Sequence, residues 1–484
     1  MRPLLLATCT LLLFAGCVGS DALYDPPGGR GFWARKSDLS SSESTFYRVT
    51  SMFAASSAHA DVYVEAKSGG ASVAAASVDN LLAAFENNIV PIEHVWYTTP
   101  TDVDQSGKVI LLLLDIQDGY QPGGGYIAGY FDPINHFTEA SVNALDSKYH
   151  SNFAEMLYLD TYPADITRTS FFATLAHEYQ HLLQFGKYYR SEQDDIEPTW
   201  LDEGLAEISS DLTGFGPQIG RANSFRTALL NKTSLIREPD RFLLDNYATS
   251  YIYFKYLADV YGLGGISAIF RNNALGVTSV NSALQSLDPN LTTACGNTLS
   301  HTYQYFNCSY RFMWGALIRN MVGDAATGAT VRYNTDASSF TLAAGASYTY
   351  KFDGSNTAFK DELTSTLASG SYGPASNANT GALQSYAPVL YKVQAGLPAP
   401  NFQTCSSCGL TLISGTDYFV VFNHDPNTAA TRSATVVDSV QQSITSEPLS
   451  SEALLAAGQT DTPLEQRALH WHFRLNPRLR DFLE

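Results

Sequence analysis

The segment Thr174-Leu-Ala-His177-Glu178-Tyr179-Gln180-His181-Leu182-Leu183 carries two histidines four residues apart. On a helix this spacing directs both imidazoles to one face, where they can bind a single metal ion with Glu178 beside it. A buried helical stripe is predicted because apolar residues recur at the required spacing, at Phe171, Leu175, Tyr179 and Leu182. Gly186 stands where a C′ glycine would end that helix.

A catalytic zinc ion needs three protein ligands and an open position for water, so one more ligand must come from another segment. The metzincin pattern is excluded, because that class has Gly and His where this chain has Gln184 and Lys187. A second helix is predicted from Pro198 to Glu207, with Thr199 as its cap and Asp202 completing a capping box. Within it, Glu203 follows His181 after 21 intervening residues and is the predicted third ligand.

Two carboxylates near Glu203 have other expected roles. Asp202 is the alternative third ligand, but its capping role is expected to turn it away from the direction of Glu203. Glu207 lies one turn after Glu203 on the same face. It is expected to orient a histidine ligand by contacting the ring nitrogen that does not bind the metal. A third ligand candidate at this spacing argues against a purely structural role for the two histidines and Glu178.

The composition of the 484 residues is typical of a folded, exported protein. Hydrophobic residues make up 45% and aromatic residues 12%, which excludes a disordered or collagen-like chain and favours two or three domains. Charged residues are only 16%, as is common in exported proteins. The net charge of −18 repels nucleic-acid phosphates, so a nucleic-acid partner is not expected.

The N-terminus resembles a bacterial lipoprotein signal peptide. The apolar run from Leu4 to Phe14 is too short to span a bilayer, and the following Ala15-Gly16-Cys17 resembles a lipobox. We expect residues 1–16 to be removed and Cys17 to carry a lipid, the protein's one membrane contact at the cell envelope. Ordinary cleavage, with secretion or a periplasmic location, is the alternative. A flexible tether is predicted for residues 17–45, with the fold beginning near Phe46.

Four further cysteines form two local pairs, Cys295 with Cys308 and Cys405 with Cys408. In an exported protein two disulfides are the simplest interpretation. The pair Cys405-Ser-Ser-Cys408 also fits half a zinc site or a redox motif, but the chain has no second such motif to complete a zinc site.

The pattern of apolar residues predicts an α+β fold in two parts. Residues 46–325 begin with short helices and strands, among them a buried strand at Lys108–Asp115 and a glycine-opened strand at Gly123–Phe131, and become mostly helical from about 166. Residues 326–440 contain short alternating segments, among them Ala329–Tyr333 and Tyr418–Asn423, which are typical of an antiparallel β-sandwich. A packing or spacer domain is the favoured interpretation, and a carbohydrate-binding or adhesion module is the alternative. Residues 441–484 form a tail, whose His470 and His472 are expected to pack at the surface.

Several segments together resemble the hyicolysin family of bacterial zinc peptidases, over roughly residues 100 to 265. They are Asp102-x-Asp104, Val109–Asp115, Gly124–Asp132, Leu157–Asp160, Leu175–His181 and Trp200–Glu207. The resemblance implies a gluzincin-like zinc peptidase domain that takes protein or peptide substrates. It also implies a mechanism in which a zinc-activated water attacks the peptide carbonyl and Glu178 is the general base.

The Trp-Leu-x-Glu-Gly segment at Trp200–Gly204 is also similar to the gluzincin aminopeptidases. Those enzymes hold the substrate amine with a Gly-x-Met-Glu-Asn segment, which this chain lacks, so an endopeptidase is expected. A zinc aminopeptidase is an alternative. Another is a non-catalytic surface binding lipoprotein on a protease scaffold, although a scaffold has no need of intact ligands and base.

Two further catalytic elements are expected near the zinc. An extended substrate is expected to pair with a strand edge at Tyr126–Phe131. Tyr247, expected to open a helix as the transition-state tyrosine does in the related aminopeptidases, is the candidate donor to the oxyanion. Tyr251, one turn later, shares its face, and a core position for both tyrosines is the alternative.

A calcium site is a weaker hypothesis. Asp102, Asp104 and Ser106 place oxygen atoms at alternate positions before Gly107, which is the spacing of a calcium loop. An EF-hand is excluded, because its bidentate glutamate would fall at Leu113 inside a predicted strand. An ordinary turn is the favoured interpretation.

Overall fold

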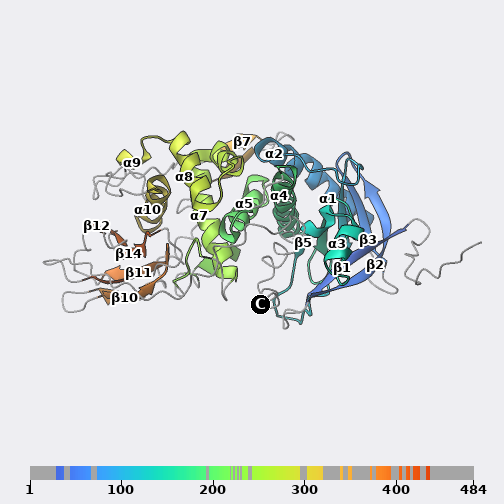
Figure 1. Ribbon diagram of the computed structural model, residues 1–484, viewed down its shortest axis with the longest axis horizontal. Coiled ribbons are helices and arrows are strands. Elements are labelled where there is room, and N and C mark those ends of the chain that lie inside the picture. The colour runs from blue at the N-terminus through green and yellow to red at the C-terminus, as the bar shows by residue number, and fades with distance from the viewer. Residues whose placement is uncertain are drawn as a thin grey trace, which may run out of the picture.

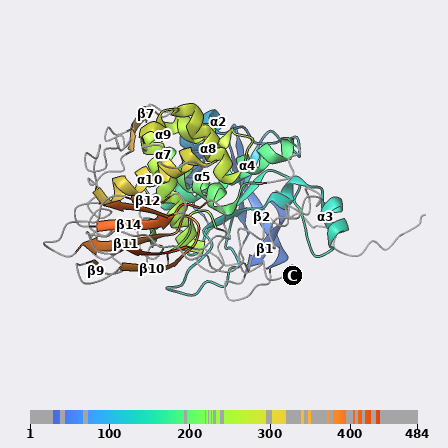
Figure 2. The same ribbon diagram turned by 60° about the vertical axis from the view of Figure 1, so that its left-hand side comes forward.

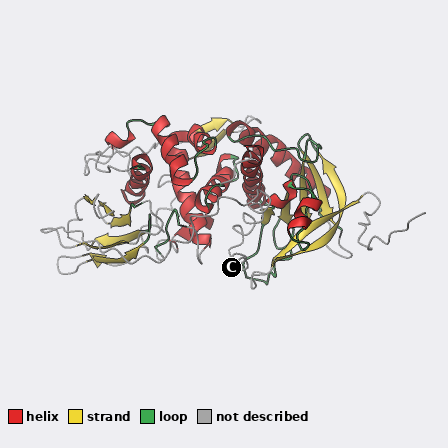
Figure 3. Ribbon diagram, viewed as in Figure 1, coloured by secondary structure: helices red, strands yellow, loops and turns green. Residues whose placement is uncertain are grey.

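The computed structural model has a β-sheet at one end, a layer of helices in the middle and a second group of strands at the other end (Figures 1 and 3). The described residues are 29–37, 44–66, 73–191, 196–218, 220–221, 224–225, 228, 232–237, 243–294, 302–319, 338–341, 347–350, 371–372, 378–393, 403–405, 410–414, 418–425 and 432–436.

The first sheet has six strands in the order β1-β2-β3-β4-β6-β5. Its strands are β1 (Gly29–Ser37), β2 (Ser44–Ser56), β3 (Ala60–Glu65), β4 (Val109–Leu114), β5 (Gly129–Phe131) and β6 (Met156–Asp160). Strands β3, β4 and β6 are parallel, whereas β1 pairs with β2, β2 with β3 and β5 with β6 in antiparallel fashion. Strand β5 therefore lies at one edge of the sheet.

Strand β4 is buried on both faces, as its uninterrupted apolar sequence predicts. Leu111 and Leu113 contribute to the large cluster shared with the helices. Ile110, Leu112 and Leu114 contribute to a second cluster on the other face, together with residues of β1, β2 and β6. The alternation of side chains along the strand thus gives the sheet two apolar faces.

The N-terminal part of the fold begins earlier than predicted. Residues 29–37 form β1, an edge strand paired along its whole length with β2, so they are not part of a flexible tether. Phe32 and Ala34 point into the core, and buried Arg35 binds Asp132 at 2.7 Å. The composition of the serine-rich residues 37–44 is typical of a flexible tether, so the hairpin was not predicted from the sequence. Residues 1–28, with Cys17, lie outside the described residues.

The helices follow the sheet. Their bounds are α1 (Ala75–Ala84), α2 (Val90–Trp96), α3 (Glu139–Leu145), α4 (Thr169–Ser191), α5 (Thr199–Leu212), α7 (Leu243–Phe270), α8 (Gly276–Leu287), α9 (Leu291–Ala294) and α10 (Gln304–Arg319), with a π-helix at Phe85–Ile89 and a 3-10 helix at Pro133–His136. Among the described residues, none of these helices has the length and apolar character needed to cross a membrane.

Helix α4 continues for five residues past Gly186, the glycine predicted to end it. A Cβ atom at Gly186 would lie 3.4 Å from Cγ2 of Thr101, so the glycine allows the loop before β4 to pack closely on the helix. This packing explains why a glycine is tolerated inside the helix.

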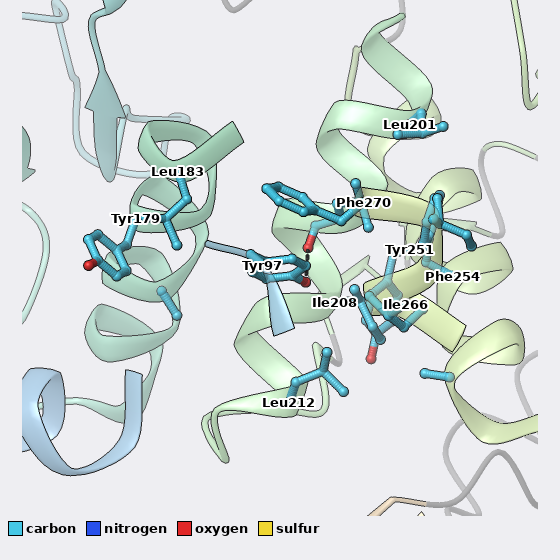
Figure 4. Close-up of a cluster of buried hydrophobic side chains, with 14 of the residues drawn as sticks. Tyr97, Tyr179, Leu183, Leu201, Ile208, Leu212, Tyr251, Phe254, Ile266 and Phe270 are labelled. Carbon is cyan, nitrogen blue, oxygen red and sulfur yellow. Dashed lines mark hydrogen bonds between the residues drawn. The ribbon is translucent and has the colours of Figure 1, made fainter. Parts of the chain in front are cut away.

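Helices α4, α5 and α7 pack side by side around an apolar core (Figure 4). Gly204 brings α5 against α7, because a Cβ atom at this position would lie 2.3 Å from the ring of Phe254. The labelled side chains of this core are Tyr97, Tyr179, Leu183, Leu201, Ile208, Leu212, Tyr251, Phe254, Ile266 and Phe270. This packing fixes α4 and α5, the helices that carry the predicted metal ligands.

The C-terminal strands form a five-stranded sheet, in the order β12-β13-β14-β11-β9, and two small pairs, β10-β15 and β7-β8. Their bounds are β7 (Ser338–Thr341), β8 (Ser347–Tyr350), β9 (Ser371–Tyr372), β10 (Ala378–Leu383), β11 (Pro388–Val393), β12 (Gln403–Cys405), β13 (Leu410–Ser414), β14 (Tyr418–Asn423) and β15 (Arg432–Val436). The predicted strand at Ala329–Tyr333 and the tail at 441–484 lie outside the described residues.

Helix α10 connects the helical layer to these strands (Figure 2). Tyr310 of α10 contacts Phe422 edge to face at 5.0 Å, and Phe306 contacts Tyr386 at 4.9 Å. Both pairs belong to the same apolar cluster as the central helices, so the strands share a core with α10. A separate sandwich domain therefore stays a prediction. Cys308 of α10 is disulfide-bonded, and Cys295 and Cys408 lie outside the described residues.

Candidate metal centre

Helices α4 and α5 bring His177, His181 and Glu203 together as one group of potential ligand atoms, all within 4.8 Å of one another. The Nε2 atoms of the two histidines are 3.0 Å apart. Oε2 of Glu203 lies 3.3 Å from Nε2 of His177 and 3.5 Å from Nε2 of His181. The two imidazoles and the carboxylate therefore converge on one point.

Two of the three spacings, 3.3 and 3.5 Å to Glu203, match those of a tetrahedral zinc ion, and the 3.0 Å between the two imidazole nitrogens is slightly shorter. Zinc–nitrogen and zinc–oxygen bonds of about 2.0–2.2 Å place neighbouring ligands in a tetrahedron about 3.3–3.6 Å apart. Oε2 of Glu203 is buried, and no hydrogen bond of acceptable geometry reaches it despite the nearby nitrogens. A buried carboxylate oxygen with this gap in its hydrogen bonding is suited to a metal, which takes its lone pair directly.

A carboxylate lies near the Nδ1 atom of each of the two histidines. Oδ1 of Asp202 is 3.4 Å from Nδ1 of His181, and Oε1 of Glu207 is 3.7 Å from Nδ1 of His177. Such partners hold an imidazole so that its other nitrogen faces the metal. Glu207 lies on the Nδ1 side of His177, as its expected role requires, but at a distance longer than a hydrogen bond, so that role stays a prediction.

The structure corrects the expected capping box. Pro198 is the N-cap residue of α5, its side chain makes no capping hydrogen bond, and Thr199, the predicted cap, is already within the helix. The carboxylate of Asp202, in the first turn of α5, contacts His181, which the sequence did not predict. The described group of potential ligand atoms contains Glu203 and not Asp202, so Glu203 is the candidate third ligand.

Arg221 is a second residue that sequence reasoning missed. Its guanidinium binds Oε1 of Glu207 through two nitrogens, at 2.6 and 2.7 Å, and lies 5.1 Å from the centre of the Tyr247 ring. Arg221 thus links the carboxylate behind His177 to the candidate oxyanion donor. No motif in the sequence marks it, because the link depends on how the segment after α5 folds back.

The centre strongly favours positive charge. Burial by itself would lower the pKa of His181, but Asp202 and Glu203 raise it well above its usual value. The pKa of His177 is raised in the same way, since Glu203 and Glu207 outweigh burial. Burial would raise the pKa of Glu203, yet the two imidazoles hold it below its usual range. A cation is therefore stabilised at this point.

Glu178 lies beside the histidines and under the edge strand β5. Its Oε2 accepts a hydrogen bond of 2.9 Å from the backbone nitrogen of Phe131. Burial raises the pKa of Glu178, against the opposing effect of the two histidines. Gly129 allows this close approach, because a Cβ atom there would lie 2.9 Å from Cγ2 of Thr174 and 3.3 Å from Cγ of Glu178. The predicted strand is shorter than expected, with only Gly129–Phe131 in β5.

Tyr247 and Tyr251 lie in different surroundings. Helix α7 begins at Leu243, so Tyr247 lies in its second turn and does not open it. Its hydroxyl interacts with Glu203, and burial followed by this carboxylate raises its pKa well above the usual value. Tyr251 instead donates to Oδ2 of Asp211 at 2.9 Å and accepts from the backbone nitrogen of Gln218. Tyr247 therefore contacts a residue of the candidate metal group.

The aspartates of the predicted calcium loop make turn interactions. Oδ1 of Asp104 accepts from the nitrogen of Ser106, and Oδ1 of Asp102 accepts from the nitrogen of Gly107. Oγ of Ser106 donates to the carbonyl of Lys108. One carboxylate oxygen each of Asp102, Asp104 and Glu155 lies within 4.8 Å of the others, an arrangement that exposed acidic groups commonly have without a metal. These contacts fit the turn interpretation, and none of them supports calcium.

Comparison with known proteins supports a metallopeptidase. No protein-family model matches the chain. Over 189 residues, 37% of the chain, the sequence is 34% identical to the neutral metalloprotease ShpI of Staphylococcus hyicus. The match covers 41% of that protein, so the chain spans less than half the length of the relative.

Proposed function

We propose that the chain is a zinc-dependent endopeptidase of the hyicolysin type, with His177, His181 and Glu203 as zinc ligands and Glu178 as general base. The observation that carries this proposal is the convergence of the three ligand atoms beside a buried carboxylate. Similarity to a neutral metalloprotease supports the same class of reaction.

The residues of this chain have distinct tasks in the proposed reaction. When bound, zinc lowers the pKa of a water molecule and polarises the substrate carbonyl. Glu178 takes the proton from the attacking water at its carboxylate and delivers it to the departing amine. The hydrogen bond from Phe131 holds the carboxylate in place, and its raised pKa suits a group that must accept and return a proton.

Substrate is proposed to lie along β5. Because Ala128 accepts a hydrogen bond from Asp160 of β6, the alternation of an antiparallel ladder turns the backbone of Gly129 and Phe131 outward. The nitrogen of Phe131 already donates to Glu178, so the nitrogen and carbonyl of Gly129 and the carbonyl of Phe131 are the groups proposed to pair with substrate. An extended peptide can add to this edge beside Glu178. Tyr247 is proposed to donate a hydrogen bond to the carbonyl oxygen as negative charge develops there.

Export and an anchor on Cys17 are part of the proposal and rest on the sequence of the N-terminus. The lack of a Gly-x-Met-Glu-Asn segment supports an endopeptidase over an aminopeptidase. A non-catalytic binding protein on the same scaffold is the rival function.

Purified protein tests the proposal through its zinc content and its hydrolysis of casein. The expected result is one zinc per chain and cleavage that stops when a chelator removes the metal and returns when zinc is restored. Metal-free protein that cleaves nothing would favour the binding protein. Release of single N-terminal residues without internal cleavage would favour the aminopeptidase.

A further inference from the structure

Three tyrosines form an exposed aromatic cluster near β5. Tyr120 lies between the other two and contacts Tyr126 at 6.1 Å and Tyr162 at 5.8 Å, both edge to face. Tyr126 is 42% exposed and Tyr162 is 58% exposed. Large aromatic rings gathered at the surface of a folded protein commonly mark a binding site.

Buried carboxylates hold the loops that carry the cluster. Asp118 accepts hydrogen bonds from the backbone nitrogens of Tyr120, at 2.9 Å, and Ile127, at 2.6 Å, and thereby closes the loop between them. Asp160 similarly accepts from the nitrogens of Ile116 and Ala164, which connects the loops that follow β4 and β6. The rings are therefore presented on a fixed frame, which lowers the entropy lost when a ligand binds.

The cluster lies just beyond the N-terminal end of β5, the strand proposed to pair with substrate. The backbone hydrogen bond between Ala128 and Asp160 ends the β5–β6 ladder, and Tyr126 and Tyr162 each lie two residues beyond it. Tyr126 precedes Gly129 by three residues, which corresponds to roughly 10 Å of extended chain. A peptide paired with Gly129 reaches the cluster with a residue about three positions away.

We propose that Tyr126 and Tyr162 form a substrate subsite that binds an aromatic or large aliphatic side chain, about three residues from the substrate residue paired with Gly129. This inference rests on the proposed peptidase function. Apolar side chains gain from burial against ring faces and edges, and tyrosines lose little conformational freedom on binding them. The preferred substrates are accordingly extended peptides with a bulky apolar residue at that position.

A series of fluorogenic peptides tests the subsite. Starting from a short cleaved core, the peptide is lengthened residue by residue at each end, with Phe, Leu, Ala, Lys or Glu at each added position. The wild-type protein is expected to show a rise of roughly tenfold in kcat/KM for Phe or Leu over Ala at one added position. The variant Tyr126→Ala/Tyr162→Ala is expected to lose this preference, so that its kcat/KM for Phe or Leu at that position equals its kcat/KM for Ala.

Two controls separate the possible outcomes. Tyr126→Phe/Tyr162→Phe retains the rings and should retain the preference, and Phe53→Ala removes an exposed ring on β2 and should change nothing. A preference that persists without the two rings, or a preference for Lys over Phe at that position, would overturn the subsite. Wild-type protein that cleaves no peptide, with zinc bound, would contradict the proposed function itself.

Discussion

Nδ1 of His181 lies 3.4 Å from Oδ1 of Asp202, the residue directly before the proposed ligand Glu203. Adjacent residues of α5 thus contact the two ring nitrogens of His181. Asp202 lies at Nδ1, and Glu203 lies at Nε2, the nitrogen proposed to bind the metal. The N-terminal part of α5 consequently carries both the proposed third ligand and the residue that would orient the proposed second ligand.

Replacing Asp202 separates these two roles. In Asp202→Ala, His181 loses the partner at Nδ1 while the three proposed ligands remain, so zinc affinity is expected to fall roughly 10–100-fold. In Glu203→Ala, zinc binding is expected to be lost. Competition with a chelating indicator measures both. Zinc lost from Asp202→Ala but retained by Glu203→Ala would make Asp202 the third ligand. Asp165→Ala, at an exposed turn, is the control.

The two tyrosines of α7 should respond differently to removal of the hydroxyl. Tyr247→Phe is expected to lower kcat roughly 100-fold, with KM and zinc content little changed, because its hydrogen bond forms mainly in the transition state. Tyr251→Phe loses the bond to Asp211 and is expected to reduce stability by about 1 kcal/mol with kcat unchanged. Steady-state kinetics and thermal melts decide the assignment. A loss of kcat in Tyr251→Phe alone would transfer the role to that residue.

Gly129 should be needed for the placement of Glu178. In Gly129→Ala the new methyl group meets Cγ2 of Thr174 at 2.9 Å and the carbonyl oxygen of Tyr158 at 3.0 Å, so β5 or α4 must shift. Activity is expected to fall at least tenfold, because small misplacements of catalytic groups are costly. Adding Thr174→Ser removes Cγ2 and should restore part of the activity. Equal kcat/KM in Gly129→Ala and wild type would show that β5 and Glu178 are not coupled in this way.

Glu197 should make stability depend on pH. It is 3% exposed and accepts a hydrogen bond of 2.7 Å from the nitrogen of Gly276, and burial raises its pKa to about 7. The folded state therefore holds a proton that the unfolded state releases near pH 4.5. The stabilisation is fully present below pH 4.5 and is lost as the pH rises through 7, a change of about 3 kcal/mol.

Glu197→Gln retains the hydrogen-bond acceptor and removes the titrating group. Relative to wild type, the variant is expected to gain stability steadily between pH 4.5 and 8. Urea unfolding of both proteins across this range measures the difference. A constant difference at all pH values would rule out this titration.

Local patterns predicted the elements that have strong periodicity. The stripe along α4, the buried run of β4 and the alternating segment Tyr418–Asn423 match the structure because burial imposes each period on the sequence. The His177–His181 pair could also be predicted, since four residues make about one helical turn. The group formed by this pair and Glu203 in the structure matches the ligand set chosen from spacing and resemblance.

Features that depend on distant contacts could not be predicted in this way. Arg35 is a charged residue that is stable in β1 only because Asp132, far along the chain, neutralises it. The contact of Asp202 with His181 could not be predicted, because the two residues lie on different helices. Arg221 has no local signature, since its contact with Glu207 arises from the path of the chain after α5.

The proposed mechanism depends most on Glu178 acting as base at a zinc ion that it does not bind. Wild type and Glu178→Gln, purified in parallel, can be compared for zinc per chain and for the rate of casein hydrolysis. We expect one zinc in each protein and hydrolysis only in wild type, because the variant lacks the proton acceptor alone. Hydrolysis by Glu178→Gln at a rate close to wild type, with zinc bound, would contradict this mechanism.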